Sequence, residues 1–411
     1  MTKIDSQGSR SLVRVLLGVL AAAVVFVLGF GSGVGVTWLS TSHGVGGAKH
    51  QANAQDWDQR TDLLTQMRDI LQKEYIDPAA VDDQKMIYAA AGGMVAALGD
   101  AHTTFVEPQA AAILDEDMQG FFEGIGATVD MVNGQVVIVR PLPGSPAEMA
   151  GIKAGDCILA VDGQELAGKT ITEAITLIRG PRGSVVSLLV QREGVTEPFT
   201  VEVTRDRIEL ETVEYRMLED GVAYLRLAEF NAVSAEKVDA ALKDLMAQEP
   251  VGLIFDLRDN PGGYLNMAVA VAGEFLPRDT LVLIERLRDK PDEEFRVQGN
   301  GTAVDVPLVV LINGGSASAS EIVAGAIQEQ HRGTLIGETT YGKGSVQQTH
   351  TLSDGSSLRV TVARWLLPSG RNLDGDGIVP DRVVTLTAED VDNGRDPQLD
   401  AARELLIQQA R

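Results

Sequence analysis

The spacing of apolar residues changes several times along the chain, and each change predicts a different kind of structure. Residues 15–30 form an unbroken run of apolar and glycine residues, and residues 31–39 extend this run. Further on, apolar residues recur at helical spacing over 58–74 and again near 83–98. Short strands separated by turn signals follow from 120 to 204, and beyond that point strands alternate with helices. The pattern predicts a multidomain α/β protein.

Six segments are expected from these changes in pattern. In order they are a cytoplasmic tip with a membrane segment, a polar linker, a small helical domain, a β-rich domain, an α/β domain and a C-terminal helical tail. Their boundaries are 1–40, 41–56, 57–108, 109–205, 206–390 and 391–411. Within the β-rich domain we expect strands at 135–139, 157–161 and 185–191.

The first apolar run is long enough to cross a bilayer as a helix. Lys3, Arg10 and Arg14 precede it and only Lys49 follows closely, so the positive-inside rule keeps the first residues in the cytoplasm and exports the rest. A cleaved signal peptide is the alternative, because 52–54 resembles a cleavage site. That site lies far beyond the apolar run, and an uncleaved anchor is therefore favoured.

Composition and charge exclude several classes of function. The formal net charge of −23 gives a surface that phosphate backbones repel, so nucleic-acid binding is not expected. The single cysteine, Cys157, permits neither an intramolecular disulfide nor a cysteine-based metal cluster. None of the five histidines belongs to an HExxH motif or to a pair at ligand spacing. No metal and no other cofactor is expected.

A short glycine loop opens the β-rich domain. It comprises Gly124, Ile125, Gly126 and Ala127 and stands just before an expected strand. Successive N–H groups in such a loop can hold a carboxylate, and the neighbouring strand edge can pair with an extended peptide. A loop of four residues alone would be read as a turn. The segments that follow, GSPA, AGIKAGD and ILAVDG within 144–163, closely resemble a PDZ domain, which implies binding of free, apolar peptide carboxyl termini.

Three strands of the α/β domain are each followed by a turn rich in small residues. The strands are expected at 251–257, 306–312 and 334–336, and the first two turns lead into helices at 264–275 and 320–330. Open α/β sheets bind ligands at the carboxyl ends of their parallel strands. Ser318 follows the second strand and Lys343 follows the third, so we expect these two residues to be neighbours.

A serine and a lysine placed together can perform nucleophilic chemistry. The serine hydroxyl needs a base, and lysine can serve if its amine is neutral. A solvated lysine has a pKa near 10.4, which leaves only about one molecule in a thousand neutral at pH 7. Burial near a helix amino terminus would lower the pKa of Lys343. The first N–H groups of that helix, with those of Gly262 or Gly263, could form an oxyanion hole.

Plainer interpretations stand beside this one. Ser318 begins an S-x-x-E capping box, and Ser316 and Ser320 are rival serines. Lys343 could be a solvated surface charge, although its flanking glycines argue for close approach to other backbone.

A histidine is the alternative base for the serine. His331 falls at the far end of the helix that Ser318 begins, and His350 lies seven residues beyond Lys343. His102 is in the helical domain. A Ser-His-Asp triad is therefore the weaker assembly.

The order of motifs resembles that of the carboxy-terminal processing peptidases, also called tail-specific proteases. The motifs are LGDAHTTF at 98–105, the PDZ-like unit, LRDNPGG at 257–263, INGGSASASEIVAGA at 312–326 and IGETTYGKGSVQ at 336–347. The resemblance implies that Ser318 is the nucleophile, that Lys343 is its base and that Gln347 orients the lysine. It also implies that the N–H of Ala319 contributes to the oxyanion hole. The implied fold places a PDZ unit over a crotonase-like catalytic domain.

The resemblance also implies a function. We expect a serine endopeptidase that recognises and cleaves near the carboxyl-terminal tails of envelope proteins. Its expected location is the bacterial inner membrane with the catalytic part in the periplasm, or the soluble periplasm if the first segment is removed. An adaptor protein and a homo-oligomer are further candidate partners. A non-catalytic PDZ-type tail-binding scaffold or quality-control adaptor is the alternative function.

The DGDG segment at 374–377 resembles a calcium loop without its later ligands, and we interpret it as a structural turn.

Overall fold

The computed structural model describes residues 54–411. The chain forms two compact units, and the boundary in the sequence falls between Phe105 and Val106. The membrane segment expected at 1–40 and most of the expected linker lie outside the described residues. Between residues 54 and 411, no helix has both the length and the apolar character needed to cross a bilayer.

The first unit contains two helices joined by a short turn. These are α2 (Ala54–Glu74), the 3-10 turn η1 (Pro78–Ala80) and α3 (Asp83–Ala96), and the short strand β1 (Thr104–Val106) follows at the unit boundary. The helices expected at 58–74 and 83–98 are confirmed. The Arg68 guanidinium joins them by donating two hydrogen bonds, of 3.0 and 2.8 Å, to the Asp83 carboxylate.

The β-rich domain is an antiparallel sheet with strand order β3-β4-β5-β7-β8, and β6 pairs with β5. The segments just before β3 and just after β8 form a separate antiparallel pair, β2 with β9. The strands are β2 (Phe121–Gly124), β3 (Ala127–Val132), β4 (Gln135–Pro141), β5 (Cys157–Val161), β6 (Gln164–Glu165), β7 (Val185–Gln191), β8 (Phe199–Thr204) and β9 (Asp206–Glu209). The helices are α5 (Pro146–Met149) and α6 (Ile171–Ile178). All three strands expected here are confirmed.

Alternation along β7 shows how this domain buries its core. Val186, Leu188 and Val190 are fully buried and pack with Ala174 and Ile178 of α6. The residues between them point to the other face of the sheet, as the period of two requires.

The α/β domain is built on a sheet with strand order β10-β11-β12-β15-β16-β19. All neighbours in it are parallel except β10, which is antiparallel to β11. The strands are β10 (Val213–Met217), β11 (Val222–Leu227), β12 (Gly252–Asp256), β15 (Leu308–Ile312), β16 (Thr334–Gly337) and β19 (Arg382–Val383). The strands expected at 251–257, 306–312 and 334–336 are therefore confirmed, with β15 between the other two.

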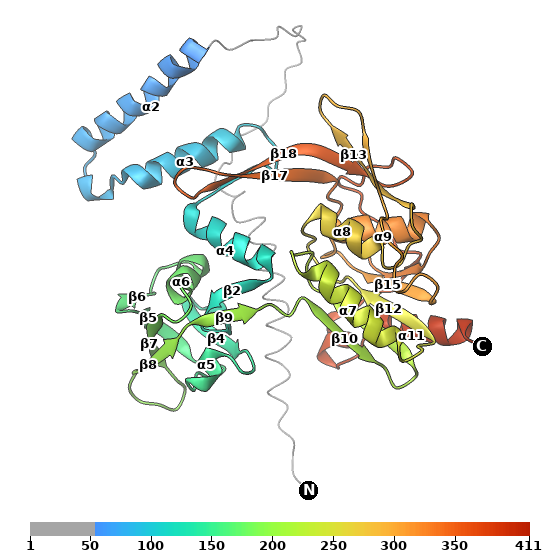
Figure 1. Ribbon diagram of the computed structural model, residues 1–411. Coiled ribbons are helices and arrows are strands. Elements are labelled where there is room, and N and C mark those ends of the chain that lie inside the picture. The colour runs from blue at the N-terminus through green and yellow to red at the C-terminus, as the bar shows by residue number, and fades with distance from the viewer. Residues whose placement is uncertain (1–53) are drawn as a thin grey trace. The chain divides into compact units, whose positions relative to one another are not determined.

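Helices cover both faces of this sheet (Figure 1). One face packs against α7 (Ser234–Met246), α8 (Leu265–Ala272) and α9 (Ala319–Glu329). The other face packs against α11 (Pro397–Gln409), where Ala402 and Leu406 are fully buried. The segment separated as a tail at 391–411 thus supplies one layer of the α/β domain.

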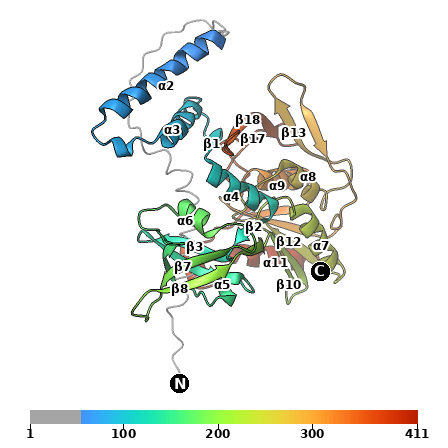
Figure 2. The ribbon, with the colours of Figure 1, turned by 60° about the vertical axis from the view of Figure 1, so that its left-hand side comes forward.

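A second antiparallel sheet and two linking helices complete this unit. The strands β13 (Leu281–Leu287), β14 (Glu293–Arg296), β17 (Ser345–Thr351) and β18 (Ser357–Leu366) form the sheet, and α10 (Ala388–Asp392) precedes α11. The helix α4 (Pro108–Gln119) packs on α6 and β2 (Figure 2). Its end also bonds to the α/β domain, since the Met118 carbonyl accepts from the Ala232 N–H at 2.9 Å.

Candidate active site

The three expected turns meet at one edge of the parallel sheet. β12, β15 and β16 are direct neighbours, so their carboxyl ends lie side by side. Backbone hydrogen bonds then tie the loops together. The Ala317 N–H donates to the Asn260 carbonyl at 3.0 Å, and the Tyr341 N–H donates to the Ser316 carbonyl at 3.0 Å. The expected convergence of these loops is confirmed.

Ser318 differs from the serines on either side of it. Ser316 and Ser320 are fully buried, and their hydroxyls donate to the carbonyls of Leu257 at 2.7 Å and Asn260 at 2.9 Å. Ser318 is only partly buried. Its backbone has φ 54° and ψ −112°, a conformation that a residue with a Cβ rarely adopts. Such strain costs roughly 1–3 kcal/mol and concentrates at functional sites.

Glu321 connects the serine loop to the lysine loop. Its carboxylate is fully buried in the first turn of α9. One oxygen, Oε2, accepts the N–H of Ser318 at 2.8 Å and the N–H of Lys343 at 2.9 Å. The other, Oε1, accepts the N–H of Gly342 at 2.7 Å and the Thr340 hydroxyl at 2.6 Å. The capping box seen in the sequence indicated only the first of these four contacts.

The glycines beside Lys343 allow its loop to pack closely against other backbone. Gly342 has φ 86°, and a Cβ there would lie 2.8 Å from the Gly377 nitrogen. A Cβ on Gly344 would lie 2.2 Å from the side-chain oxygen of Asn372. Trp365 holds the same loop from a third side, because its indole N–H donates to the Lys343 carbonyl at 2.9 Å. The close approach expected from these glycines is confirmed.

The DGDG segment holds this loop in place. Oδ1 of Asp374 accepts the Gly344 N–H at 2.5 Å, and the Gly375 N–H donates to the Gly342 carbonyl at 3.0 Å. The structural interpretation of 374–377 is confirmed by these contacts. Throughout residues 54–411, no group of three or more histidine, cysteine, aspartate or glutamate side chains is arranged to hold a metal ion.

Gln347 lies in β17, four residues after Lys343. Its side-chain amide donates to the hydroxyl of Ser345 at 2.9 Å and to the hydroxyl of Thr361 at 3.3 Å. These bonds fix the side chain on the β17–β18 hairpin. That Gln347 orients the lysine remains a prediction.

The N–H groups of Gly262, Gly263 and Ala319 are the predicted donors of an oxyanion hole. Gly262 packs directly against Ser318, since a Cβ on Gly262 would lie 2.8 Å from the serine Cβ. The Gly262 N–H, however, donates to the side chain of Asn260 at 2.9 Å. In the described part of the chain, the N–H groups of Gly263 and Ala319 have no acceptor. The geometry therefore favours Gly263 and Ala319 over Gly262 as donors.

The histidines near these loops are poorly placed to act as the base. His331 lies beyond the far end of α9. His350 is exposed near the end of β17, five residues beyond the start of that strand. At about 3.3 Å per residue, His350 lies roughly 16 Å along the strand from Ser345, which is next to the lysine loop.

The predicted peptide-binding loop is firmly held in the β-rich domain. Gly126 has φ 73°, and a Cβ on it would lie 2.5 Å from Ser145. The carbonyls of Ile125 and Gly126 accept N–H groups from the segment 142–147 at 2.8 and 2.9 Å. Gly124 ends β2 and Ala127 begins β3, which is an edge strand of its sheet. The strand edge expected beside the glycine loop is confirmed, and carboxylate binding remains a prediction.

The serine assignment leads to a comparison of three single variants. We expect Ser318→Ala to abolish covalent labelling by a serine-directed fluorophosphonate, because the attacking oxygen is gone. Ser316→Ala and Ser320→Ala should keep the labelling but lower the free energy of unfolding by about 1 kcal/mol, since each removes the hydrogen bond of a buried hydroxyl. Labelling detected by mass spectrometry and urea unfolding measure both effects. A labelled Ser318→Ala protein would place the nucleophile elsewhere.

The shared carboxylate gives a second expectation. Glu321→Gln keeps the size of the side chain but turns an amide NH₂ toward backbone N–H groups, so buried donors lose their acceptor. We expect the free energy of unfolding to fall by about 2–4 kcal/mol. Peptide hydrolysis should slow at least about 100-fold, because the two loops lose their alignment. The control is Glu329→Gln at the other end of α9, where the carboxylate accepts from Ser369. Parental turnover by Glu321→Gln would contradict a positioning role.

Comparisons with known proteins agree with this arrangement. The sequence profile of Peptidase family S41 matches residues 221–384, which contain all three loops, and the profile of the PDZ domain matches residues 137–192. A solved structure of a Bacteroides fragilis protein assigned to the S41 proteases is 19% identical. It covers 84% of this chain and 97% of its own, with a TM-score of 0.52, and so supports the fold.

Curated relatives extend the similarity over most of the chain. A carboxy-terminal-processing protease of Bartonella bacilliformis is 39% identical over 307 residues, which are 74% of this chain and 70% of that protein. A carboxy-terminal processing protease of Bacillus subtilis is 35% identical over 351 residues, 85% of this chain and 74% of that protein. The chain therefore belongs to peptidase family S41 and is a serine peptidase.

Proposed function

We propose that this peptidase cleaves polypeptides near their carboxyl-terminal tails, with Ser318 as nucleophile and Lys343 as its general base. One observation carries the pairing: the backbone N–H groups of both residues donate to the same buried oxygen of Glu321. A shared acceptor fixes the two loops relative to each other. The strained backbone of Ser318 supports its role as the reacting serine.

The chemistry follows from this placement. The neutral amine of Lys343 takes the proton of the Ser318 hydroxyl while the oxygen attacks the scissile carbonyl. The N–H groups of Gly263 and Ala319 stabilise the oxyanion that forms. Protonated Lys343 then gives its proton to the leaving amine, and water hydrolyses the acyl-enzyme with the lysine again as base. Gln347 keeps the amine in line without adding a charge.

The β-rich domain would deliver the substrate by binding its carboxyl terminus. The glycine loop at 124–127 presents backbone N–H groups for the terminal carboxylate, and edge strand β3 can pair with the extended tail. The match to the PDZ domain and the relatives named for carboxy-terminal processing support this role. Apolar terminal residues are the expected preference.

The first forty residues would set the location. Their long apolar run, with basic residues mainly before it, supports an anchor in the bacterial inner membrane with the peptidase on the periplasmic side. Envelope proteins are the substrates within reach of such an enzyme.

A lysine base and a merely electrostatic lysine predict different outcomes for Lys343→Arg. A guanidinium does not give up its proton between pH 6 and 10, so Lys343→Arg and Lys343→Ala should both be inactive. The parental rate should rise with pH, because the amine is a cation when protonated and acts as a base only after losing its proton. Hydrolysis of one unstructured peptide across this range measures both effects, with Lys290→Arg on the exposed β13–β14 turn as control. Near-normal turnover by Lys343→Arg would remove the lysine from the mechanism.

Tail binding is tested with matched peptides that differ only at the carboxyl terminus. On the Ser318→Ala protein, a peptide with a free acid should bind at least about tenfold more tightly than its amide, because only the acid offers a carboxylate to the glycine loop. Fluorescence anisotropy measures the two affinities. Equal affinities would show that the PDZ domain does not recognise the terminal carboxylate.

A further inference from the structure

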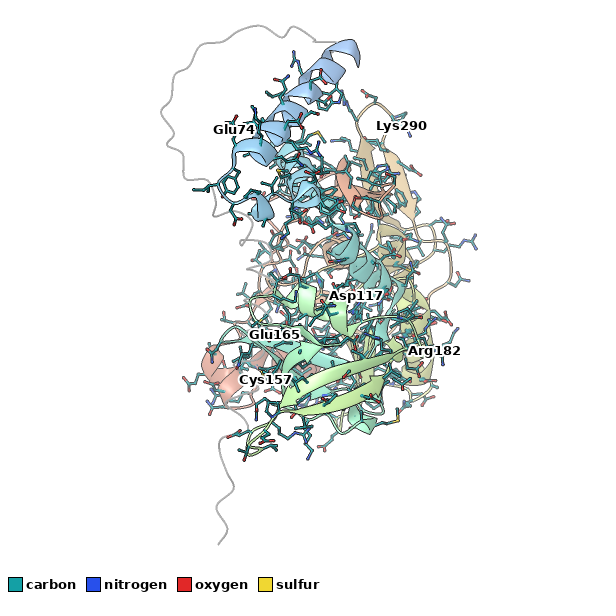
Figure 3. The ribbon with its side chains drawn as sticks, turned by 90° about the vertical axis from the view of Figure 1, so that its left-hand side faces the viewer. Glu74, Asp117, Cys157, Glu165, Arg182 and Lys290 are labelled. Carbon is teal, nitrogen blue, oxygen red and sulfur yellow. The ribbon has the colours of Figure 1, made fainter. Side chains whose placement is uncertain are left out.

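A pocket of about 340 Å³ lies where α4, the end of α6 and the α/β domain come together. Its wall carries four charged residues, Asp117, Arg179, Glu229 and Arg359, together with the apolar side chains of Leu114, Met118 and Leu210. Figure 3 labels Asp117 near the end of α4. None of the charged residues belongs to the peptidase chemistry described above.

Glu229 links the pocket to the glycine turn through the chain. The next residue, Phe230, is bonded to the glycine turn on both sides. Its N–H donates to the Gly262 carbonyl at 2.8 Å, and its carbonyl accepts from the Tyr264 N–H at 2.8 Å. Glu229 is therefore attached to the segment that holds Gly263 in place.

The same pocket reaches the face of the β17–β18 hairpin that carries Gln347. In this register Gln347 lies opposite Thr361, and Thr349 lies opposite Arg359. Alternate residues of a strand share a face, so Arg359 and Gln347 lie on the same side of the hairpin. The hydrogen bond from Gln347 to Thr361 agrees with this placement of the Gln347 side chain. Two residues of the pocket thus lie on segments that support the site: Glu229 beside the residue that bonds to the glycine turn, and Arg359 on the hairpin of Gln347.

Two polar groups in the pocket have no partner in the part of the chain that the structure describes. The Arg359 guanidinium lines the pocket and makes no hydrogen bond or ion pair within residues 54–411, and its Nε is buried. The Glu229 carboxylate is partly buried and makes no hydrogen bond or ion pair within residues 54–411. Burial raises the pKa of Glu229 to about 7, and the negative charge of Asp117 adds to the effect. Charged groups that are largely removed from water are normally paired, so these two indicate a ligand with both an acceptor and a donor.

The other charges in the pocket already have partners. Arg179 donates to Glu116 at 3.2 Å and to Asp117 at 3.0 Å, and its guanidinium lies 4.3 Å from the centre of the Phe122 ring. Arg179 is thus paired with two carboxylates of α4. Glu229 and Arg359 form no ion pair with each other and supply one acceptor and one donor group, which a neutral polar group of a ligand can satisfy together.

We infer that the pocket binds an amide group of the substrate, whose carbonyl accepts from the terminal N–H groups of the Arg359 guanidinium and whose N–H donates to Glu229. The inference rests on the proposed cleavage of peptides at Ser318. A peptide offers this chemistry from its main chain or from an asparagine or glutamine side chain. The apolar wall formed by Leu114, Met118 and Leu210 suits the aliphatic part of either. Glu229 and Arg359 are then residues that position the substrate and contribute to specificity.

The inference predicts a pH dependence of binding. An N–H that donates to Glu229 favours the ionised carboxylate, so the bound peptide lowers the pKa of Glu229. Affinity should therefore rise as pH increases through about 7, the value for the protein without peptide. The charged groups that face this site are Asp117 with its neighbours Asp115 and Glu116 on α4, Arg179 after α6 and Arg359 on β18. The nearby Tyr264 hydroxyl remains neutral, because burial raises its pKa.

Binding of an amidated, unstructured peptide to the full-length Ser318→Ala protein tests the inference without any turnover. The amide reduces the contribution of the glycine loop at 124–127. At pH 8, Glu229→Leu and Arg359→Met should each weaken binding about tenfold, as expected for one hydrogen bond and the partner left unpaired. Between pH 6 and 8 the affinity of the parent should rise several-fold, whereas Glu229→Gln should be flat. Exposed Glu236→Gln on α7 serves as the control.

Two peptide series distinguish the sources of the amide. If a side chain occupies the pocket, replacing a single glutamine or asparagine by leucine removes the dependence on Glu229. If the main chain does, the dependence persists in every sequence and disappears when one backbone amide is replaced by an ester. Parental affinity for both Glu229→Leu and Arg359→Met at pH 8 would overturn the inference. Because binding needs no catalysis, that result would leave the assignment of Ser318 and Lys343 intact. Failure of fluorophosphonate labelling would overturn the assignment of Ser318 and leave the measured peptide binding unaffected.

Discussion

The buried carboxylate of Glu321 is the contact on which the arrangement of this active site depends. A carboxylate taken out of water is costly unless donors surround it, and here three backbone N–H groups and one hydroxyl do so. Those donors come from two loops that follow different strands of the sheet. Satisfying Glu321 therefore requires both loops to be in place at once. The same contact that stabilises the fold brings Ser318 beside the backbone of Lys343.

The rest of the domain prepares the loops for that contact. Parallel pairing of β12, β15 and β16 places three strand ends at one edge. Glycines then let backbone approach backbone where a Cβ would collide, as at Gly262 against Ser318 and at Gly344 against Asn372. Asp374 and Trp365 hold the lysine loop from the outside. Held in this way, the fold can sustain the unfavourable backbone conformation of Ser318.

The pocket beside α4 differs in kind from this closed arrangement. Around Glu321 every oxygen has a donor, whereas Glu229 and Arg359 offer polar groups that the described chain does not satisfy. Both residues sit on elements that also support the chemistry, one next to the turn of Gly262 and Gly263 and the other on the hairpin of Gln347. A substrate that satisfies them would be held by both of these elements.

The sequence by itself determined the strands at 251–257, 306–312 and 334–336 and the loops that follow them, because hydrophobic period and turn residues are local signals. The second antiparallel sheet of β13, β14, β17 and β18 was not expected from the sequence. The sequence also determined that Ser318 and Lys343 would be neighbours, since one parallel crossover separates them. The tertiary structure alone decided that Glu321 serves both loops, because S-x-x-E encodes only its contact with Ser318. It likewise decided that Asn260 occupies the Gly262 N–H, and that Glu229 and Arg359 share a pocket. Such contacts join residues distant in sequence, and strand register and side-chain packing fix them only once the chain has folded.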